Sequence, residues 1–356
     1  MDKLQVKFPH RIRDVDPAIN TELLEYFKGE RTGFVQVGPE GYFFPHKFKE
    51  EAEQYYNFEA RPDDIWITTV PRSGTTWTQE LIWLVANGLD FEQAQERPLT
   101  ERFPFFEFPL FMHNDVKAEL IAENEGNDKA IEFIELISRP GYETLDELPR
   151  NQRRFIKTHF PFSLMPPSVL EKKCKIIYVA RNPKDVAVSY YHLNRLFRTQ
   201  GYTGDFERYW RYFQQGLNPW LPYYSHVKEA KKFSHLSNVL FLNYEDMLID
   251  LPGTVNRVGD FLNCRPDAEG LQKLLDHLSI GNFRQNKSVN MHQMAAVGIL
   301  KDGEEGFVRR GGKDRDATKQ ADQQEFVNNP NLLKNANEWV QHNIEKFQTA
   351  CDKNLH

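Results

Sequence analysis

One stretch, TTVPRSGTTWTQELIWLV from Thr68 to Val85, constrains the fold of this chain more than any other. It continues an apolar run that begins at Ile65, breaks into a polar loop, and resumes with apolar residues at the spacing of a helix. Two further apolar runs, Lys175 to Ala180 and Val239 to Leu242, also lead into helical patterns. Short strands that alternate with helices predict an α/β fold with a parallel sheet. Ligands of such sheets bind at the carboxyl ends of the strands, where these polar loops lie.

The polar loop after the first of these strands has the composition of an anion-binding turn. The first N–H groups of a helix have no intrahelical partners and lie at the positive end of its dipole. Gly74 lets the backbone approach an anion, Ser73, Thr75 and Thr76 add hydroxyl donors, and Arg72 adds a permanent charge. Together they predict a phosphate or sulfate site, although simple capping of the helix explains the same residues. The Walker pattern GxxxxGK[ST] is not met, so a kinase or NTPase of the usual kind is disfavoured.

A second candidate site lies in RRFIKTHFP, where Phe155 to Thr158 is predicted to be a strand. Side chains alternate along a strand, so Lys157 and His159 share one face near its carboxyl end. A histidine there can take a proton from an attacking hydroxyl, and a neighbouring lysine can stabilise developing negative charge. Taken alone, His159 is more often a structural histidine than a catalytic one.

Two other stretches place arginines beside a strand end or glycines. In ARNPKDVAVSYYH, Arg181 follows a strand directly and Ser189 lies on the predicted helix, an arrangement that suits phosphate recognition. In FVRRGG, Phe307 to Gly312, two arginines can surround an anion. The alternatives are a surface arginine with an unused helical serine, and a solvated basic loop.

Aromatic residues are concentrated in ERFPFFEFPLF, which contributes Phe103, Phe105, Phe106, Phe108 and Phe111. Aromatics at this density fill the core or line an apolar pocket, and the core is the more common case. Elsewhere the glycines of QVGPEGYFF predict a hairpin near Gly38 and Gly41. The segment from Asn114 to Leu148 is acidic and partly helical, with a break at Arg139 to Gly141, and Asp302 to Gln324 is a loop by composition.

Composition excludes several classes of function. The 356 residues are 40% hydrophobic and 27% charged, as in a protein able to bury a sizeable core. The formal net charge is -6 and the sequence has no long block of Lys and Arg, so nucleic acid is not an expected partner. No apolar run approaches the roughly 20 residues that span a bilayer. Cys174, Cys264 and Cys351 form no metal motif and no disulfide framework, which favours a reducing cytosol.

The motifs, taken together, resemble one family. TVPRSGTTW, RFIKTHFP, ARNPKDVAVSYYH, FLNYEDM and FVRRGG occur in the order and approximate spacing of the cytosolic sulfotransferases, which use 3'-phosphoadenosine 5'-phosphosulfate (PAPS). The likeness runs from about Pro45 to Gly312. It implies a single α/β domain over residues 1 to 356, with a parallel sheet flanked by helices and a P-loop-like nucleotide fold.

The resemblance also implies roles for individual residues. Residues 72 to 76 would hold the 5'-phosphosulfate, His159 would be the catalytic base, and Lys157 and Arg72 would stabilise charge. Phe105 and Phe108, with Lys157 and His159, would line the acceptor pocket. The nucleotide-binding residues would be Arg72, Ser73, Gly74, Thr75, Thr76, Trp77, Arg181, Ser189, Tyr244, Leu278, Ser279, Phe283, Phe307, Val308, Arg309, Arg310 and Gly311. PAPS would leave as adenosine 3',5'-bisphosphate, and no metal is expected.

The chain departs from the family pattern at several places, among them the adenine-side segment, where Leu278 and Ile280 stand in place of a common threonine and aromatic residue. Most members have lysine where Arg72 stands, and arginine, with a pKa above about 12, stabilises charge but is a poor proton donor. The stretch from Glu107 to Lys157 is longer than in most members, and retinol dehydratase, another member, has a similar arginine and a similar insertion. We interpret residues 114 to 148 as a lid over a large apolar acceptor, with a surface excursion as the alternative. After Gly311 the usual GDW is replaced by GKDRDATKQ, so the usual dimer motif is missing. A homodimer stays an open alternative.

The sequence therefore predicts a cytoplasmic PAPS-dependent sulfotransferase that acts on the hydroxyl of a small apolar phenol, alcohol, sterol or retinoid. Two alternatives stay open. The first is an enzyme like retinol dehydratase that eliminates sulfate from a transient allylic sulfate. The second is a carrier of lipophilic ligands without turnover.

Overall fold

A four-stranded parallel sheet forms the centre of the computed structural model, which describes residues 6–304, 306–308 and 325–352. Its strands lie in the order β5 (Phe155–Thr158), β4 (Ile65–Thr69), β6 (Lys175–Ala180) and β7 (Val239–Asn243). All three neighbouring pairs are parallel. The predicted strands and the α/β class are confirmed, with β7 one residue longer than expected. Their carboxyl ends therefore meet at one edge, which carries Arg72, His159 and Arg181 just beyond the strands.

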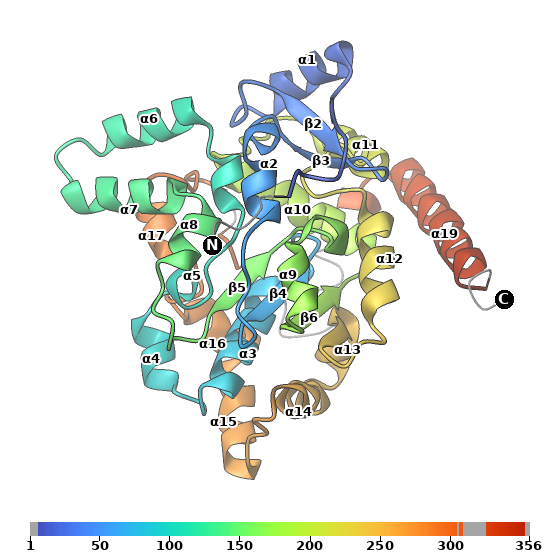
Figure 1. Ribbon diagram of the computed structural model, residues 1–356. Coiled ribbons are helices and arrows are strands. Elements are labelled where there is room, and N and C mark those ends of the chain that lie inside the picture. The colour runs from blue at the N-terminus through green and yellow to red at the C-terminus, as the bar shows by residue number, and fades with distance from the viewer. Residues whose placement is uncertain (1–5, 305, 309–324, 353–356) are drawn as a thin grey trace.

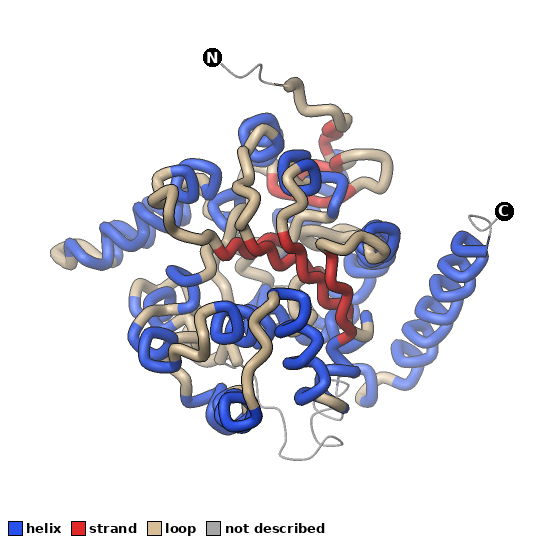
Figure 2. The backbone as a smooth tube through the Cα atoms, turned by 60° about the horizontal axis from the view of Figure 1, so that its bottom comes forward, coloured by secondary structure: helices blue, strands red, loops and turns tan. Residues whose placement is uncertain are grey.

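The two faces of the sheet are covered by different helices because alternate side chains of each strand point to opposite sides. Ile67 and Ile177 pack with α3 (Thr75–Ala86) and α14 (Leu251–Leu262). On the other face Trp66 and Tyr178 join a larger core with α2 (Phe48–Tyr56), α10 (Pro183–Leu196) and α12 (Tyr223–Phe233). Figure 1 and Figure 2 show the strands between these helical layers. One helix of each layer, α3 after β4 and α10 after β6, begins at the carboxyl edge of the sheet and so places side chains there.

A second, antiparallel sheet consists of β1 (Ile12–Asp14), β2 (Phe34–Val37) and β3 (Tyr42–Pro45). The predicted hairpin is β2–β3, and Gly38 and Gly41 both adopt φ of 73° in its turn, which glycine tolerates best. The first strand was not predicted, because three residues with two charges give no apolar pattern.

The residues that we predicted as a lid form three helices: α6 (Asn114–Glu123), α7 (Asp128–Ser138) and α8 (Gly141–Asp146). The predicted break lies between α7 and α8, where Arg139 and Pro140 interrupt the helix. In Figure 1, α6 and α7 form a helical hairpin that extends beyond the rest of the molecule. The apolar sides of these helices pack beside Phe108 and the segment around Met294.

The remaining elements complete both layers and the C-terminal part. They are α1 (Pro17–Tyr26), α4 (Phe91–Glu96), α5 (Leu99–Arg102), η1 (Phe108–Phe111), η2 (Phe162–Leu164), α9 (Pro167–Glu171), α11 (Phe206–Gln215), α13 (Tyr244–Ile249), α15 (Ala268–His277), α16 (Ile280–Gln285), α17 (His292–Ala296) and α19 (Pro330–Asp352). In Figure 1 and Figure 2 the last of them, α19, projects from the body at the C-terminal side. Across the part of the chain that the structure describes, no helix combines the length and apolar character of a membrane span.

Candidate active site

The loop between β4 and α3 has the backbone geometry of an anion-binding turn. Gly74 precedes α3 with φ of 91°, and no side chain caps the helix, so its first N–H groups remain available. A Cβ on Gly74 would lie 2.4 Å from Cδ2 of Tyr244, so a larger residue does not fit between loop and ring. The Ser73 hydroxyl is buried and has no hydrogen-bond partner among the described residues. A close backbone approach and an unpaired buried hydroxyl are what a phosphosulfate group needs.

Two arginines, from the loops after β4 and β6, meet at this turn. Arg72, itself at φ of 71°, donates from Nε to the Ser189 hydroxyl at 2.9 Å and from its terminal nitrogens to the Phe307 carbonyl at 3.4 Å. The Arg181 guanidinium donates to the Arg72 carbonyl at 3.0 Å and lies 4.5 Å from the centre of the Tyr244 ring. The structure thus brings four of the predicted nucleotide residues together, although Arg72 and Phe307 are 235 positions apart in the sequence.

The predicted adenine-side residues lie together on the α3 side of the sheet. Trp77 donates from its indole N–H to the Leu278 carbonyl at 2.9 Å and meets Tyr244 edge to face at 6.0 Å. Ser279 precedes α16, and Phe283 on that helix is buried in the same apolar cluster. These side chains form an apolar and aromatic boundary beside the anion-binding loop.

Other predicted nucleotide residues are less constrained by the structure. Thr75 is buried and Thr76 is partly exposed, both in the first turn of α3. Val308 packs against the sheet cluster. Arg309, Arg310 and Gly311 lie outside the described residues.

His159 is held in one tautomer just beyond β5. Its Nδ1 lies 2.7 Å from the Thr69 carbonyl, which can only accept a hydrogen bond, so Nδ1 carries the proton. The other ring nitrogen, Nε2, is then left with a lone pair. Burial first, and then the charge of Lys157, lower the pKa of His159 well below its usual range. The ring is therefore neutral near pH 7, as a general base must be.

A hydroxyl contact joins this histidine to the anion-binding loop. The Thr69 hydroxyl lies 2.7 Å from the Thr75 hydroxyl and 3.2 Å from Nδ1 of His159. The end of β4 thus fixes the distance between the loop and the histidine. The anion-binding loop and His159 therefore belong to one site.

Lys157 is buried beside the aromatic residues that the sequence placed at the acceptor. Its ammonium lies 4.2 Å from the centre of the Phe105 ring, and Phe105 packs edge to face on His159 at 5.0 Å. Burial lowers the pKa of Lys157 to about 8, with Arg72 acting in the same direction and Glu107 against it. Phe108 continues this wall at 5.9 Å from Phe105. The predicted catalytic and acceptor residues are thus in contact.

Sequence reasoning missed three residues that contact His159, namely Glu107, Trp220 and His226. Glu107 accepts a hydrogen bond from the His159 backbone N–H at 2.6 Å and another from the Trp220 indole at 3.0 Å. The Trp220 ring lies 5.1 Å from that of His159 and 4.1 Å from that of Phe111. A lone carboxylate among phenylalanines was the available signal for Glu107, because buried acidic residues are rare. Trp220 lies in the loop before α12 and gave none.

A second histidine supports the same backbone. His226 on α12 bonds through Nε2 to the His159 carbonyl at 3.0 Å and through Nδ1 to the Tyr178 hydroxyl at 2.9 Å. The carbonyl accepts, so Nε2 carries the proton and the tyrosine donates to Nδ1. Burial lowers the pKa of His226 to about 4, which keeps it neutral. Its distance from RFIKTHFP in the sequence concealed this contact.

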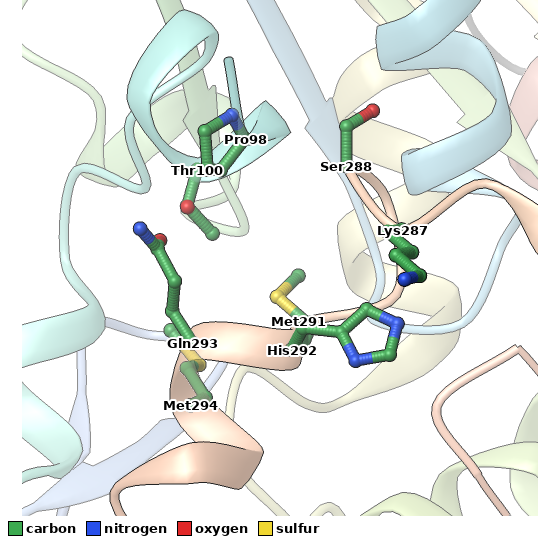
Figure 3. Close-up of a pocket in the computed structure, with 8 residues that line it drawn as sticks. All are labelled: Pro98, Thr100, Lys287, Ser288, Met291, His292, Gln293 and Met294. Atoms are coloured by element: carbon green, nitrogen blue, oxygen red, sulfur yellow. The ribbon is translucent and has the colours of Figure 1, made fainter. Parts of the chain in front are cut away.

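The cavity in Figure 3 is separate from this site. It has a volume of about 40 Å³ and lies between α5 and α17, with Thr100 and Gln293 among its lining residues. It contains none of the predicted site residues and is too small for a nucleotide. Among the described residues, no group of three or more His, Cys, Asp or Glu side chains could hold a metal ion.

Comparison with known proteins supplies the family. The family model described as "Sulfotransferase domain" matches residues 62–348, which is most of the chain. The chain belongs to the sulfotransferase family. Luciferin sulfotransferase of Photinus pyralis is 33% identical over 291 residues, covering 80% of this chain and 73% of the relative. Sulfotransferase 1E1 of Mus musculus is 34% identical over 254 residues, covering 71% and 77%.

Two solved structures resemble this sulfotransferase over nearly its whole length. Retinol dehydratase in a complex with retinol and PAP, adenosine 3',5'-bisphosphate, is 35% identical with a TM-score of 0.86, covering 95% of this chain and 98% of that one. Its complex with androsterone and the inactive cofactor PAP gives 35% identity and a TM-score of 0.84, covering 95% and 97%. The recognised family and its retinol dehydratase likeness are confirmed. The enzyme is a PAPS-dependent sulfotransferase, and PAP is the product of its cofactor.

Proposed function

We propose that this sulfotransferase transfers the sulfuryl group to the hydroxyl of a small apolar acceptor, with His159 as the base. The observation that carries the proposal is the tautomer of His159: Nδ1–H donates to the Thr69 carbonyl, which leaves Nε2 to accept the acceptor proton. PAPS supplies the sulfuryl group and a bisphosphate leaving group. Positioning of the acceptor oxygen and removal of its proton are then the main tasks of the protein.

The other side chains of the site would bind the nucleotide or stabilise negative charge. Residues 72 to 76 would hold the 5'-phosphosulfate with backbone N–H groups, hydroxyls and the Arg72 charge, and Arg181 and Ser189 would hold the 3'-phosphate. Arg72 reaches the same loop and is permanently charged, so it stabilises negative charge without donating a proton. Lys157, beside His159, stabilises charge at the reacting oxygens while it is protonated.

The acceptor would lie against an aromatic and aliphatic surface. Phe105 and Phe108 join an apolar cluster that includes Leu196, Met294 and Phe307. This surface offers dispersion contacts and few hydrogen bonds, so it favours a lipophilic alcohol, phenol, sterol or retinoid. The complexes of retinol dehydratase with retinol and androsterone support this acceptor class.

We infer that residues 114–148 form a lid over this acceptor surface. Leu120 of α6 and Ile134 of α7 are fully buried in the same cluster as Phe108. The outer side of α6 is tied to the body by ion pairs, with Glu119 to Arg31 at 2.7 Å and Glu123 to Arg198. A helical hairpin with one face on the acceptor surface and another tied by exposed pairs can open without disturbing the sheet.

A second candidate reaction is dehydration of an allylic alcohol. Sulfation of the hydroxyl would be followed by cleavage of the C–O bond, departure of sulfate with the electron pair, and loss of a proton from the conjugated chain. The structural likeness to retinol dehydratase and the arginine at position 72 favour this candidate. A carrier without turnover is disfavoured, because binding alone needs neither His159 nor Lys157.

The deciding experiment incubates the protein with labelled PAPS and a panel of phenols, sterols and retinoids. A stable labelled sulfate ester supports transfer, whereas an olefin with released labelled sulfate supports dehydration. If no label leaves PAPS with any acceptor while calorimetry shows that PAP binds, the proposed reaction is wrong and the result supports a carrier without turnover. The same family likeness leads us to infer a cytoplasmic location, which fractionation of cells that express the protein would test.

A further inference from the structure

Glu107 is a fully buried carboxylate at the carboxyl edge of the sheet, directly before η1. One oxygen accepts from the His159 backbone N–H at 2.6 Å and from the Trp220 indole N–H at 3.0 Å. The other accepts from the Thr158 hydroxyl at 2.8 Å. Three donors, two from consecutive residues at the end of β5 and one from the loop before α12, thus converge on a single side chain.

The donors around Glu107 fit its ionised form. The two N–H groups can only donate, and the Thr158 hydroxyl already accepts from the Phe160 N–H at 3.0 Å, so it points its proton at Glu107. Burial raises the pKa of Glu107 to about 7, while these hydrogen bonds and the nearby Lys157 act in the opposite direction. Above that pH the carboxylate is the negative charge that faces Lys157.

We propose that Glu107 is a positioning residue for the transfer reaction, which holds the His159 backbone and the Trp220 ring and supplies the counter-charge of Lys157. This inference rests on the proposed function in taking His159 as the base. The contacts of Glu107 are with the backbone of His159 and with Thr158 and Trp220, so it acts through other residues.

The restraints on His159 show why a carboxylate is needed at this place. The His159 N–H is held by Glu107, its carbonyl by His226 and its ring by the Thr69 carbonyl. Loss of the first restraint would let the backbone after β5 shift, and a small displacement of a base lowers the rate steeply. Trp220, held by the same carboxylate, packs edge to face on the His159 ring at 5.1 Å.

The charges that face each group set the expected pH behaviour. Burial and Arg72 lower the pKa of Lys157, whereas Glu107 raises it. Tyr55 faces Glu107 from α2, and the carboxylate contributes to raising the pKa of that tyrosine. His226 and Lys157 both face His159. Removing the negative charge of Glu107 therefore removes the influence that raises the pKa of Lys157, while burial and Arg72 still lower it, and so favours the neutral form of the lysine.

Glu107→Gln separates charge from shape. The amide oxygen can still accept from His159 and Trp220, so these two hydrogen bonds survive while the charge is lost. The amide nitrogen can only donate, so the bond with Thr158 must reverse its direction. Glu229→Gln is the matched control, because Glu229 also accepts three hydrogen bonds, one from Tyr42 and two from Ser163, and its hydrogen-bond partners among the described residues do not include His159 or Lys157. Its activity and pH profile should equal those of the parent enzyme.

We expect Glu107→Gln to lower kcat by about 10- to 100-fold with little change in the KM for PAPS. The alkaline limb of the pH profile, which reports Lys157, should move to lower pH by about one unit or more. Thr158→Val gives a second variant if the first does not fold. Loss of that donated bond raises the pKa of Glu107. The acid limb of the pH profile, which reports the ionisation of Glu107, should therefore move to higher pH. Limbs that stay in place in the folded variants would overturn the proposal.

A second experiment, which does not depend on turnover, is ¹³Cε-lysine NMR of the parent, Glu107→Gln and Glu229→Gln proteins. The Lys157 resonance should titrate at lower pH in Glu107→Gln alone. An unchanged midpoint would refute the counter-charge role even if the rate falls. If the parent protein transfers label to no acceptor, the proposed function fails, while the titration still decides whether Glu107 governs the charge of Lys157.

Discussion

The two halves of the candidate site solve their electrostatic problems differently. The anion-binding loop uses groups whose charge does not change near pH 7, namely backbone N–H groups, hydroxyls and the guanidinium of Arg72. The acceptor side uses Glu107, Lys157 and His159, which are buried and whose pKa values are moved by burial and by one another. The difference teaches that nucleotide binding should be insensitive to substitutions and pH changes that stop the transfer.

The largest expected effect separates the two halves at His159. His159→Ala should lower kcat by about 10²- to 10⁴-fold, because proton removal loses its base. Affinity for PAP should stay within about twofold, since the loop contacts are intact. Initial rates with labelled PAPS and calorimetry with PAP measure the two quantities. His235→Ala, at an exposed histidine, is the control. Loss of PAP binding in a folded His159→Ala protein would make the histidine structural.

A substitution in the loop should have the opposite signature. Gly74→Ala places a Cβ 2.4 Å from the Tyr244 ring at a φ of 91°, so we expect affinity for PAP to fall by about tenfold or more. Gly88→Ala is the matched control, since Gly88 also has a left-handed φ, of 63°, but an added Cβ meets nothing within 4 Å. Both variants should lose about 1 kcal/mol of stability from backbone strain. Equal PAP affinity in the two variants would contradict the close approach at Gly74.

The pH dependence should come from the acceptor side alone. Lys157 must be protonated, so kcat should fall as pH rises through about 8. His159 must be neutral, and because its pKa is lowered well below the usual range, its own protonation should not limit the rate near neutral pH. PAP affinity should change little between about pH 7.5 and 9, since the guanidinium groups stay charged. A parallel fall of PAP affinity and kcat would show that the two halves are not separate.

Arg72→Lys tests the departure of this chain from most of its relatives. A single ammonium cannot contact both the Ser189 hydroxyl and the Phe307 carbonyl as the guanidinium does, so PAP affinity should fall by about two- to tenfold. Turnover should hold or rise, because lysine can also protonate a departing oxygen. Single-turnover rates at saturating PAPS measure this. A collapse of the rate would refute a purely electrostatic role for Arg72.

The smallest effect is expected at the proposed lid. Glu119→Gln with Glu123→Gln removes the ion pairs of α6 with Arg31 and Arg198, which are exposed and therefore contribute less than about 1 kcal/mol each. Acceptor KM should rise by about two- to threefold, and added salt should reproduce the change in the parent enzyme. Glu135→Gln is the control, because its partner Lys117 also lies within the insertion. No change in acceptor KM would favour a surface excursion.

The contrast between the two halves of the site also explains which features the sequence could predict. The four parallel strands, the loop at Arg72 to Thr76 and the pair Lys157 and His159 were predicted, because each depends on residues close together in the chain. Strand periodicity and the unpaired N–H groups of a helix start are local properties. The sequence by itself therefore determined the fold class, the anion-binding loop and the candidate base.

Tertiary structure alone decided how the base is held and charged. Glu107, Trp220 and His226 reach His159 from an aromatic loop, a loop before α12 and α12 itself. Their separations of 52 to 67 positions from His159 leave no periodic pattern. The choice of tautomer depends on the Thr69 carbonyl, 90 positions away. The physical reason is that desolvation and charge act through space: the pKa of a buried group depends on which atoms surround it, and folding brings those atoms from segments far apart in the chain.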